Sequence, residues 1–174
     1  MKRIAVIAAL AALSPIFAAE IPLNGDFKKS SLNAPTPFSW VKNLSPKIQG
    51  PDAGVTKLFE KDGKRFFNVK SASKQIPFYN GIPFAVKPGE KITMSATVSG
   101  KGKIVFHAYG YGEKNKYLTT LPLGKPAEAS AGKVQGSAIL KADTKVKAVR
   151  MAFVIYPNSD INISDIKAET TEQK

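Results

Sequence analysis

The fold class of this chain is decided by Ile92-Thr-Met-Ser-Ala-Thr-Val98 and Ile104-Val-Phe-His-Ala-Tyr109. In the first run the even positions are apolar and the odd positions carry hydroxyl groups, which is the period-two pattern of a half-buried β-strand. The second run alternates in the same way. One face carries Ile104, Phe106 and Ala108, and the other carries Val105, His107, Tyr109 and, just beyond the run, Tyr111.

The two runs have two possible spatial relations. If they pair as a hairpin, a loop of Ser99-Gly100-Lys101 matches their apolar faces, because a slip of one residue would turn every side chain over. The opposite face would then carry Thr93, Ser95, His107, Tyr109 and Tyr111. In a jelly roll, successive strands can instead cross between two sheets, which keeps the face of each strand and removes the cross-strand pairs. In the hairpin arrangement this aromatic and hydroxyl surface is the leading candidate for the working face.

The first residues have the pattern of a secretory signal. A basic end, Met1-Lys-Arg3, precedes an apolar core from Ile4 to Leu13 and small residues up to Ala19. A membrane anchor is disfavoured because the apolar run is shorter than the roughly 20 residues that span a bilayer. We therefore expect cleavage after Ala19, no transmembrane segment, and a secreted or periplasmic bacterial protein. The absence of cysteine excludes a lipid-modified cysteine and a disulfide-stapled module.

The predicted mature chain is strongly basic. Removing residues 1–19 leaves 155 of the 174 residues, enough for one domain, and lowers the formal net charge from +13 to +11 because Lys2 and Arg3 are lost. Such an excess favours polyanionic partners, such as an acidic or sulfated polysaccharide or an anionic envelope surface. We do not expect nucleic acid as the partner. The alternative is a soluble surface with charged strand edges, which needs no polyanion.

The remaining sequence predicts an all-β domain over residues 20–169. Asp62-Gly63 between two short runs is a strong hairpin signal, and the two prolines of Ile76–Phe84 confine that segment to an edge or a loop. Further strands are expected at 55–60, 65–70, 117–121, 134–140, 146–156 and 161–169, with a bulge near Asp165. Residues 170–174 are expected to form a disordered tail. This pattern predicts a single two-sheet β-sandwich, with a jelly roll as the favoured topology.

Several short pieces, in order, resemble a known family. They are Leu23-Asn-Gly-Asp-Phe27, Trp40, Val86-Lys-Pro-Gly-Glu-Lys-Ile-Thr-Met-Ser95, Val149-Arg-Met-Ala-Phe-Val154 and Ile163-Ser-Asp-Ile166. Their order and spacing are similar to carbohydrate-binding modules of the galactose-binding-like jelly-roll type, which are appended to bacterial glycoside hydrolases. The resemblance implies carbohydrate binding without catalysis, and it implies that Trp40 packs between the sheets.

The resemblance also implies a structural calcium ion between the first and last strands, with Asp26 and Asp165 at the matching positions. The sequence departs from the family pattern, because Lys28 and Ser164 stand where further acidic residues are usual. Calcium takes six to eight oxygen ligands, and carboxylates supply the charge. The alternative makes Asp26 a turn residue and Asp165 a bulge residue.

Sugar binding requires aromatic rings that stack on a pyranose, with hydrogen-bonding groups around them. Tyr109, Tyr111 and His107 meet that requirement on one strand face, and Arg150 and Tyr156 share a parity on another strand. The loop candidates are Tyr79, Asn80 and Tyr117. For each tyrosine taken alone, half-buried packing with the hydroxyl in water is the alternative.

Catalytic chemistry is poorly represented in the sequence. A single histidine and no cysteine exclude a two-histidine metal site and the usual zinc ligand sets. A glycosidase needs two carboxyl groups in a cleft, whereas the acidic residues here fall in or beside turns: Glu60, Asp62, Glu90, Glu113, Glu128, Asp143 and Asp160. We therefore expect no enzyme. The alternative function is a structural or adaptor protein of the envelope that uses the same fold to contact a protein or an anionic surface.

Overall fold

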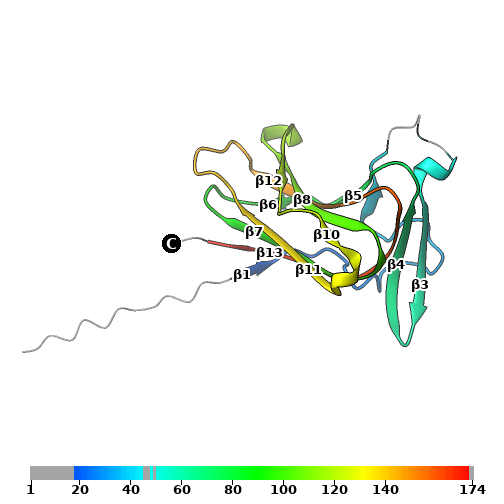
Figure 1. Cartoon of the computed structure of the whole chain (residues 1–174). Coiled ribbons are helices and arrows are strands. Elements are labelled where there is room, and N and C mark those ends of the chain that lie inside the picture. The colour runs from blue at the N-terminus through cyan, green and yellow to red at the C-terminus, as the bar shows by residue number, and fades with distance from the viewer. Residues whose placement is uncertain (1–17, 45–47, 49, 173–174) are drawn as a thin grey trace, which may run out of the picture.

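The structure is a computed structural model that describes residues 18–44, 48 and 50–172. Within these residues the chain forms two antiparallel sheets that pack face to face, as predicted for a jelly-roll β-sandwich (Figure 1). In the same residues no helix is long and apolar enough to cross a membrane. The predicted signal peptide lies almost wholly outside the described residues, which begin one residue before its expected cleavage site at Ala19.

Each sheet is built from strands that are distant in sequence. Sheet A comprises, in spatial order, β11 (Lys133–Ile139), β7 (Lys91–Lys101), β13 (Ser159–Thr171), β4 (Lys64–Ser71) and β3 (Val55–Lys61), and β1 (Ala18–Glu20) also pairs with β13. Sheet B comprises β10 (Ala127–Glu128), β8 (Lys103–Tyr111), β12 (Ala148–Ile155), β5 (Ile76–Asn80) and β2 (Trp40–Lys42), with β9 (Tyr117–Pro122) on β8 and β6 (Phe84–Ala85) on β12. The described part of the chain also contains three short 3-10 turns between strands: η1 (Gly50–Ala53), η2 (Glu113–Asn115) and η3 (Ala129–Ala131).

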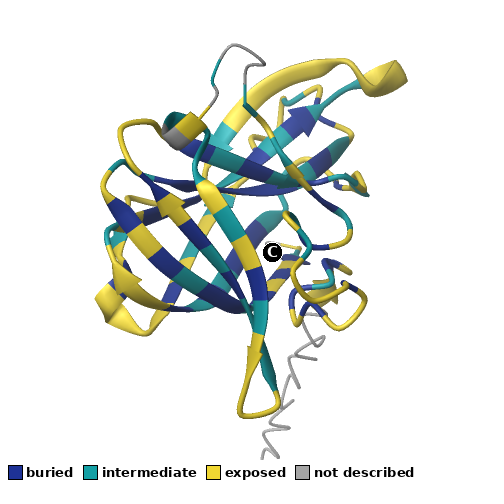
Figure 2. Ribbon diagram, turned by 90° about the vertical axis from the view of Figure 1, so that its right-hand side faces the viewer, coloured by how far each residue is buried: buried dark blue, intermediate teal, exposed yellow. Residues whose placement is uncertain are grey.

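The core lies between the two sheets and is built by the predicted alternation. Buried and exposed residues alternate along the strands, as Figure 2 shows. The inward faces of β7 and β8 carry Ile92, Met94, Ala96 and Val98, and Ile104, Phe106 and Ala108, all of them buried. Trp40 is confirmed in the core: its ring lies 5.1 Å from that of Phe153, and its indole Nε1 donates to the carbonyl of Leu23 at 3.1 Å.

Of the two relations that the sequence leaves open for β7 and β8, the hairpin does not form, and the chain instead crosses from one sheet to the other between them. β7 pairs with β11 and β13, whereas β8 pairs with β12, β9 and β10. Gly100 and Gly102 allow this crossing, since both have positive φ and a Cβ at either position would overlap residues at the start of β13. The faces of both strands are as predicted, but Thr93 and Ser95 lie on sheet A, away from His107.

The hairpin at Asp62-Gly63 is confirmed. β3 and β4 pair from Lys61 opposite Lys64 onward, and Asp62 and Gly63 have φ of 53° and 71°, as a two-residue turn of this kind requires. Outside the main body of the sandwich this hairpin projects at the lower right of Figure 1.

The proline-containing segment is more ordered than the sequence suggests. Residues 76–80 form β5, which lies between β12 and β2 and is therefore not an edge strand. Pro77 lies where the ladder between β5 and β2 has ended, since that pairing reaches only from Asn80 to Phe78, and its carbonyl still accepts a hydrogen bond from the N–H of Asn43.

The last strand contains the predicted bulge and is longer than expected. The register between β13 and β7 shifts between Ser164 and Lys167, at Asp165, whose φ is 50°. Beyond the bulge β13 continues to Thr171, so the first two residues of the predicted tail are part of a strand that pairs with Ile92 and Lys91. Residues 173 and 174 of that tail lie outside the described residues.

Candidate functional site

The outer face of sheet B is defined by alternation along β8. Because Ile104, Phe106 and Ala108 point into the core, the residues between them point outward. These outward residues are Val105, His107, Tyr109 and Tyr111. Three aromatic side chains in a row on one strand therefore face away from the core.

The strand register brings tyrosines from two further strands to this row. Ala152 of β12 lies opposite both His107 of β8 and Tyr79 of β5, and Tyr111 lies opposite Tyr117 of β9. Ring centroids are separated by 6.2 Å between Tyr79 and Tyr109, 6.5 Å between Tyr109 and Tyr117, and 6.0 Å between Tyr111 and Tyr117. We call this surface the tyrosine face: Tyr79, Tyr109, Tyr111 and Tyr117, with His107 and Arg150.

The four tyrosines surround a hollow of about 410 Å³. Asn43 and Thr120 complete its lining, and the hydroxyl groups of Tyr117 and Thr120 are hydrogen-bonded at 2.7 Å. The hollow thus combines aromatic rings with hydroxyl and amide groups, which is the composition that sugar recognition requires.

Arg150 occupies the middle of the tyrosine face. It lies opposite Tyr109 in the register of β12 and β8, and its guanidinium carbon is 5.1 Å from the ring centroid of Tyr111 and 5.6 Å from that of Tyr79. Both distances are within the range of cation–π attraction. The guanidinium group therefore lies against two rings of the tyrosine face.

Burial changes the acid-base properties of two members of this surface. Partial burial lowers the pKa of His107 below its usual 6.5, so its imidazole is neutral at pH 7. Burial, followed by the neighbouring tyrosines Tyr117, Tyr111 and Tyr79, raises the pKa of Tyr109 above 10. Its hydroxyl therefore keeps its proton and can donate a hydrogen bond.

Two of the predicted ligand-binding residues lie elsewhere. Tyr156 directly follows the end of β12, six residues after Arg150. Its backbone N–H donates to the carbonyl of Lys103. Asn80 is buried: its side-chain amide donates to the carbonyl of Leu23 and accepts from the N–H of Ile82. Asn80 therefore has a structural role, because consecutive residues of a strand point to opposite faces and Tyr79 takes the outer one.

Sequence reasoning missed Asn43 and Thr120. Thr120 is brought to the hollow by its pairing with Tyr109, and Asn43 by the hydrogen bond from its N–H to the carbonyl of Pro77. The strand at 117–121 was predicted, but its partner was not, and no pattern in the sequence marks Asn43.

The two aspartates predicted as calcium ligands are close together but lie among cations. Asp26 accepts a hydrogen bond from the N–H of Lys28, as a turn residue does, and pairs with that lysine at 3.6 Å. Asp165 lies in the bulge and pairs with Lys64. Both aspartates line a hollow of about 370 Å³ together with those lysines, Glu60 and Arg65.

These neighbours fit ion pairing better than calcium. In the described residues no group of three or more acidic, histidine or cysteine side chains could hold a metal ion. Calcium at Asp26 and Asp165 stays a prediction from the family resemblance, and the geometry favours the turn and bulge roles.

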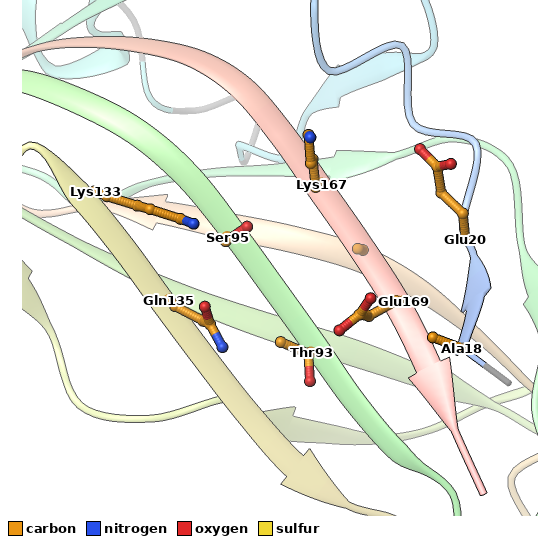
Figure 3. Close-up of a pocket in the computed structure, with 9 residues that line it drawn as sticks. Ala18, Glu20, Thr93, Ser95, Lys133, Gln135, Lys167 and Glu169 are labelled. Carbon is orange, nitrogen blue, oxygen red and sulfur yellow. The ribbon is translucent and has the colours of Figure 1, made fainter. Parts of the chain in front are cut away.

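A second hollow lies on the opposite side of the sandwich, on the outer face of sheet A. Figure 3 shows its lining from four strands: Lys133 and Gln135 of β11, Thr93 and Ser95 of β7, Lys167 and Glu169 of β13, and Ala18 and Glu20 of β1. Its volume is about 460 Å³, and its side chains are hydroxyl, amide and charged groups of both signs. Without rings in its lining it offers no stacking surface, which makes the tyrosine face the better candidate for a sugar.

No protein-family model and no curated protein matches the chain. Solved structures do match. A cyclase from Fischerella sp. TAU superimposes with a TM-score of 0.65 at 13% identity over 91% of this chain and 100% of the cyclase. The CBM22-1 xylan-binding domain of Paenibacillus barcinonensis Xyn10C gives 0.56 at 9% identity over 95% and 100% of the two chains. A CBM4 structure gives 0.53 at 13% identity over 84% and 97%.

At such low identities the likeness establishes the fold alone. The chain shares its β-sandwich with carbohydrate-binding modules and also with an enzyme. A fold of this kind is a scaffold on which unrelated functions occur, so the function has to be argued from the site.

Proposed function

We propose that this protein is exported to the periplasm or the cell exterior and binds carbohydrate, without catalysis, through the tyrosine face of sheet B. The observation that carries the proposal is the gathering of four tyrosine rings from three strands around one hollow of about 410 Å³. None of these four rings belongs to the buried core between the sheets, whose aromatic residues are Phe27, Trp40, Phe67, Phe78, Phe106 and Phe153.

The chemistry of the hollow suits a pyranose. The C–H face of a sugar ring is apolar and packs on an aromatic ring, while its hydroxyl groups need donors and acceptors at the rim. The Tyr109 hydroxyl, the Thr120 hydroxyl and the Asn43 amide lie at the hollow and can supply them. A tyrosine side chain also loses little conformational entropy on binding, because it has only two rotatable bonds.

The non-catalytic part of the proposal rests on where the carboxyl groups are. Hydrolysis of a glycosidic bond uses two carboxyl groups that flank the bond. The acidic residues of sheet B and its connections lie at its ends, with Glu113 in η2 and Glu128 in β10, where Glu128 pairs with Lys103. The tyrosine face instead places a cation, Arg150, among its rings.

The charge of the chain bears on the class of glycan. The formal net charge of +11 expected for the mature chain favours association with polyanions, and acidic or sulfated polysaccharides combine negative charge with sugar rings. Exposed charges that are farther apart than the Debye length, about 8 Å at physiological salt, are largely screened from one another. Stacking on the tyrosine face does not depend on salt in this way, so the two contributions can be separated experimentally.

The test is a glycan array that contains neutral, uronic-acid and sulfated polysaccharides, probed at low and at high salt, with and without a calcium chelator. We expect binding to a defined glycan that persists at high salt. The double variant Tyr109→Ala/Tyr111→Ala is expected to lose at least about tenfold in affinity, which is about 1.4 kcal/mol.

The matched control is Tyr156→Ala. This tyrosine directly follows the end of β12 and lies outside the tyrosine face. Binding by this variant should equal that of the unmodified protein. The proposal would be contradicted if the protein bound every polyanion, if high salt abolished this binding, and if the double variant retained it. That result would favour an envelope adaptor that contacts anionic surfaces.

A further inference from the structure

We infer that Arg150 recognises a carboxylate, so that the glycan bound on the tyrosine face contains uronic acid residues. The inference deepens the proposed function and rests on it. It concerns the guanidinium group of Arg150 and the hydrogen-bond acceptor that would pair with it.

Arg150 lies beside two of the tyrosines that line the hollow, Tyr79 and Tyr111. Its guanidinium group lies between the rings of Tyr79 and Tyr111, with carbon-to-centroid distances of 5.6 Å and 5.1 Å, and its backbone lies opposite Tyr109. A sugar ring that stacks on any of these three tyrosines comes next to the guanidinium group. Packing by the rings also fixes the orientation of the group before the ligand arrives, which lowers the entropy cost of binding.

The hydrogen-bonding capacity of Arg150 is unused. Its Nε is buried and has no hydrogen-bond partner, and among the described residues no ion pair or hydrogen bond involves its guanidinium group. Arginine carries five N–H donors, and burying a donor without an acceptor is unfavourable. By comparison, the other arginine of the described chain, Arg65, pairs with Glu60 and donates to three backbone carbonyls. The two Nη groups, which unlike Nε are not among the buried atoms without a partner, are therefore left for an acceptor from outside the chain.

The surroundings of Arg150 leave room for that acceptor. The residues two positions away on the outer face of β12 are the small Ala148 and Ala152. Tyr111 lies opposite Ala148 on β8, and Tyr79 lies opposite Ala152 on β5. The other outward residues packed against this part of β12 are apolar or uncharged, namely Pro77, Val105, Val154 and the imidazole of His107, whose lowered pKa keeps it neutral.

The geometry of the guanidinium group favours a carboxylate over other sugar substituents. Its planar fork presents parallel N–H groups that match the two oxygens of a carboxylate, and such charge-assisted pairs are stronger than hydrogen bonds to a neutral hydroxyl group. A uronic acid carries its carboxylate on the pyranose ring itself, so the ring can stack on tyrosine while the carboxylate meets Arg150. A sulfate group can also accept from arginine and is separated from a carboxylate by the test.

The test compares glucuronoxylan oligosaccharides and hexagalacturonate with the same oligosaccharides after reduction of their carboxyl groups to alcohols. Affinities are measured by titration calorimetry for the unmodified protein, Arg150→Met and Arg150→Lys. Arg150→Met keeps an unbranched side chain between the rings, and Arg150→Lys keeps the charge without the fork. Thermal unfolding of each variant establishes that it is folded, and a heparin oligosaccharide serves as the sulfated probe.

We expect at least one uronate ligand to bind about tenfold or more tightly than its reduced form. Arg150→Met should abolish that ratio and keep the weak binding of the reduced form, and Arg150→Lys should restore it only in part. If the unmodified protein bound the uronate and reduced ligands with equal affinity, and Tyr109→Ala abolished the binding of both, the inference would be overturned and the proposed function would stand. Preference for heparin that Arg150→Met removes would also overturn it. Binding of none of the saccharides tested, sulfated or not, would overturn both.

Discussion

At the scale of single residues, His107 is the only histidine of the chain and the group that titrates closest to neutrality on the tyrosine face. Partial burial lowers its pKa below the value of about 6.5 that it has in the unfolded chain. Between these two values the unfolded state binds more protons than the folded state. Stability contributed at this site is therefore constant above the unfolded pKa and falls as the pH drops through that window.

We predict that His107→Gln removes this pH dependence. Urea unfolding of both proteins should show that the stability difference between the unmodified protein and the variant is constant above about pH 7 and shifts in favour of the variant toward about pH 5. A difference that stays the same across this range would show that His107 titrates equally in the folded and unfolded states.

Neighbouring residues can have opposite roles, as Tyr79 and Asn80 show. Both were predicted as loop residues at the ligand, because the prolines around them suggested an irregular segment. Once residues 76–80 form a strand, alternation sends Tyr79 to the outer face and Asn80 into the sandwich. Whether they lie in a strand could not be predicted from local sequence, since it depends on the partner strands β12 and β2.

At the scale of elements, the bulge of β13 is joined to the first segment of the domain by Gly25. The N–H of Ile166 donates to the Gly25 carbonyl at 3.1 Å, and the N–H of Ile21 donates to Ala168 at 2.8 Å. A Cβ on Gly25 would overlap the carbonyl group of Ile166. This position therefore needs glycine for the close approach of two backbones.

We predict that Gly25→Ala destabilises the protein by about 1–3 kcal/mol, because one of the two backbone segments must move. Gly81→Ala is the matched control, since its Cβ would lie 3.5 Å from the Ser39 carbonyl oxygen, in ordinary contact, and should cost less than about 0.5 kcal/mol. Equal midpoints of urea unfolding for the two variants would contradict the account of this junction.

The alternation along each strand predicted the faces of β7 and β8 correctly but not the sheets to which they belong. A period of two is a property of one strand and its burial, whereas pairing depends on segments far away in sequence. The sequence of the four residues Ser99–Gly102 is equally compatible with a hairpin loop and with a connection that crosses from one sheet to the other. The positive φ of Gly100 and Gly102 fits both, and only packing against β13 selects the crossing.

At the scale of the whole molecule, the two outer faces differ in chemistry. Sheet B carries the tyrosine face with Arg150, and sheet A carries a polar hollow around Lys133 and Gln135 (Figure 3). The sequence predicted His107, Tyr109 and Tyr111 on one face, because aromatic residues at alternate positions are visible in one strand. It offered Arg150 of another strand as able to share that surface, and it predicted Tyr79 and Tyr117 as loop residues, although both lie in strands. It grouped Thr93 and Ser95 with the first three residues, because the sheet assignment was missing.

The measurement that tests the central claim most directly is a nuclear magnetic resonance titration of the labelled protein with a glucuronoxylan oligosaccharide. It follows the ring signals of the tyrosines and the backbone amides of both sheets. The account predicts that the ring signals of Tyr79, Tyr109, Tyr111 and Tyr117 shift with one affinity while those of Tyr156 stay in place. Shifts confined to the amides of β7, β11 and β13 around Lys133 would contradict it and place the ligand on sheet A.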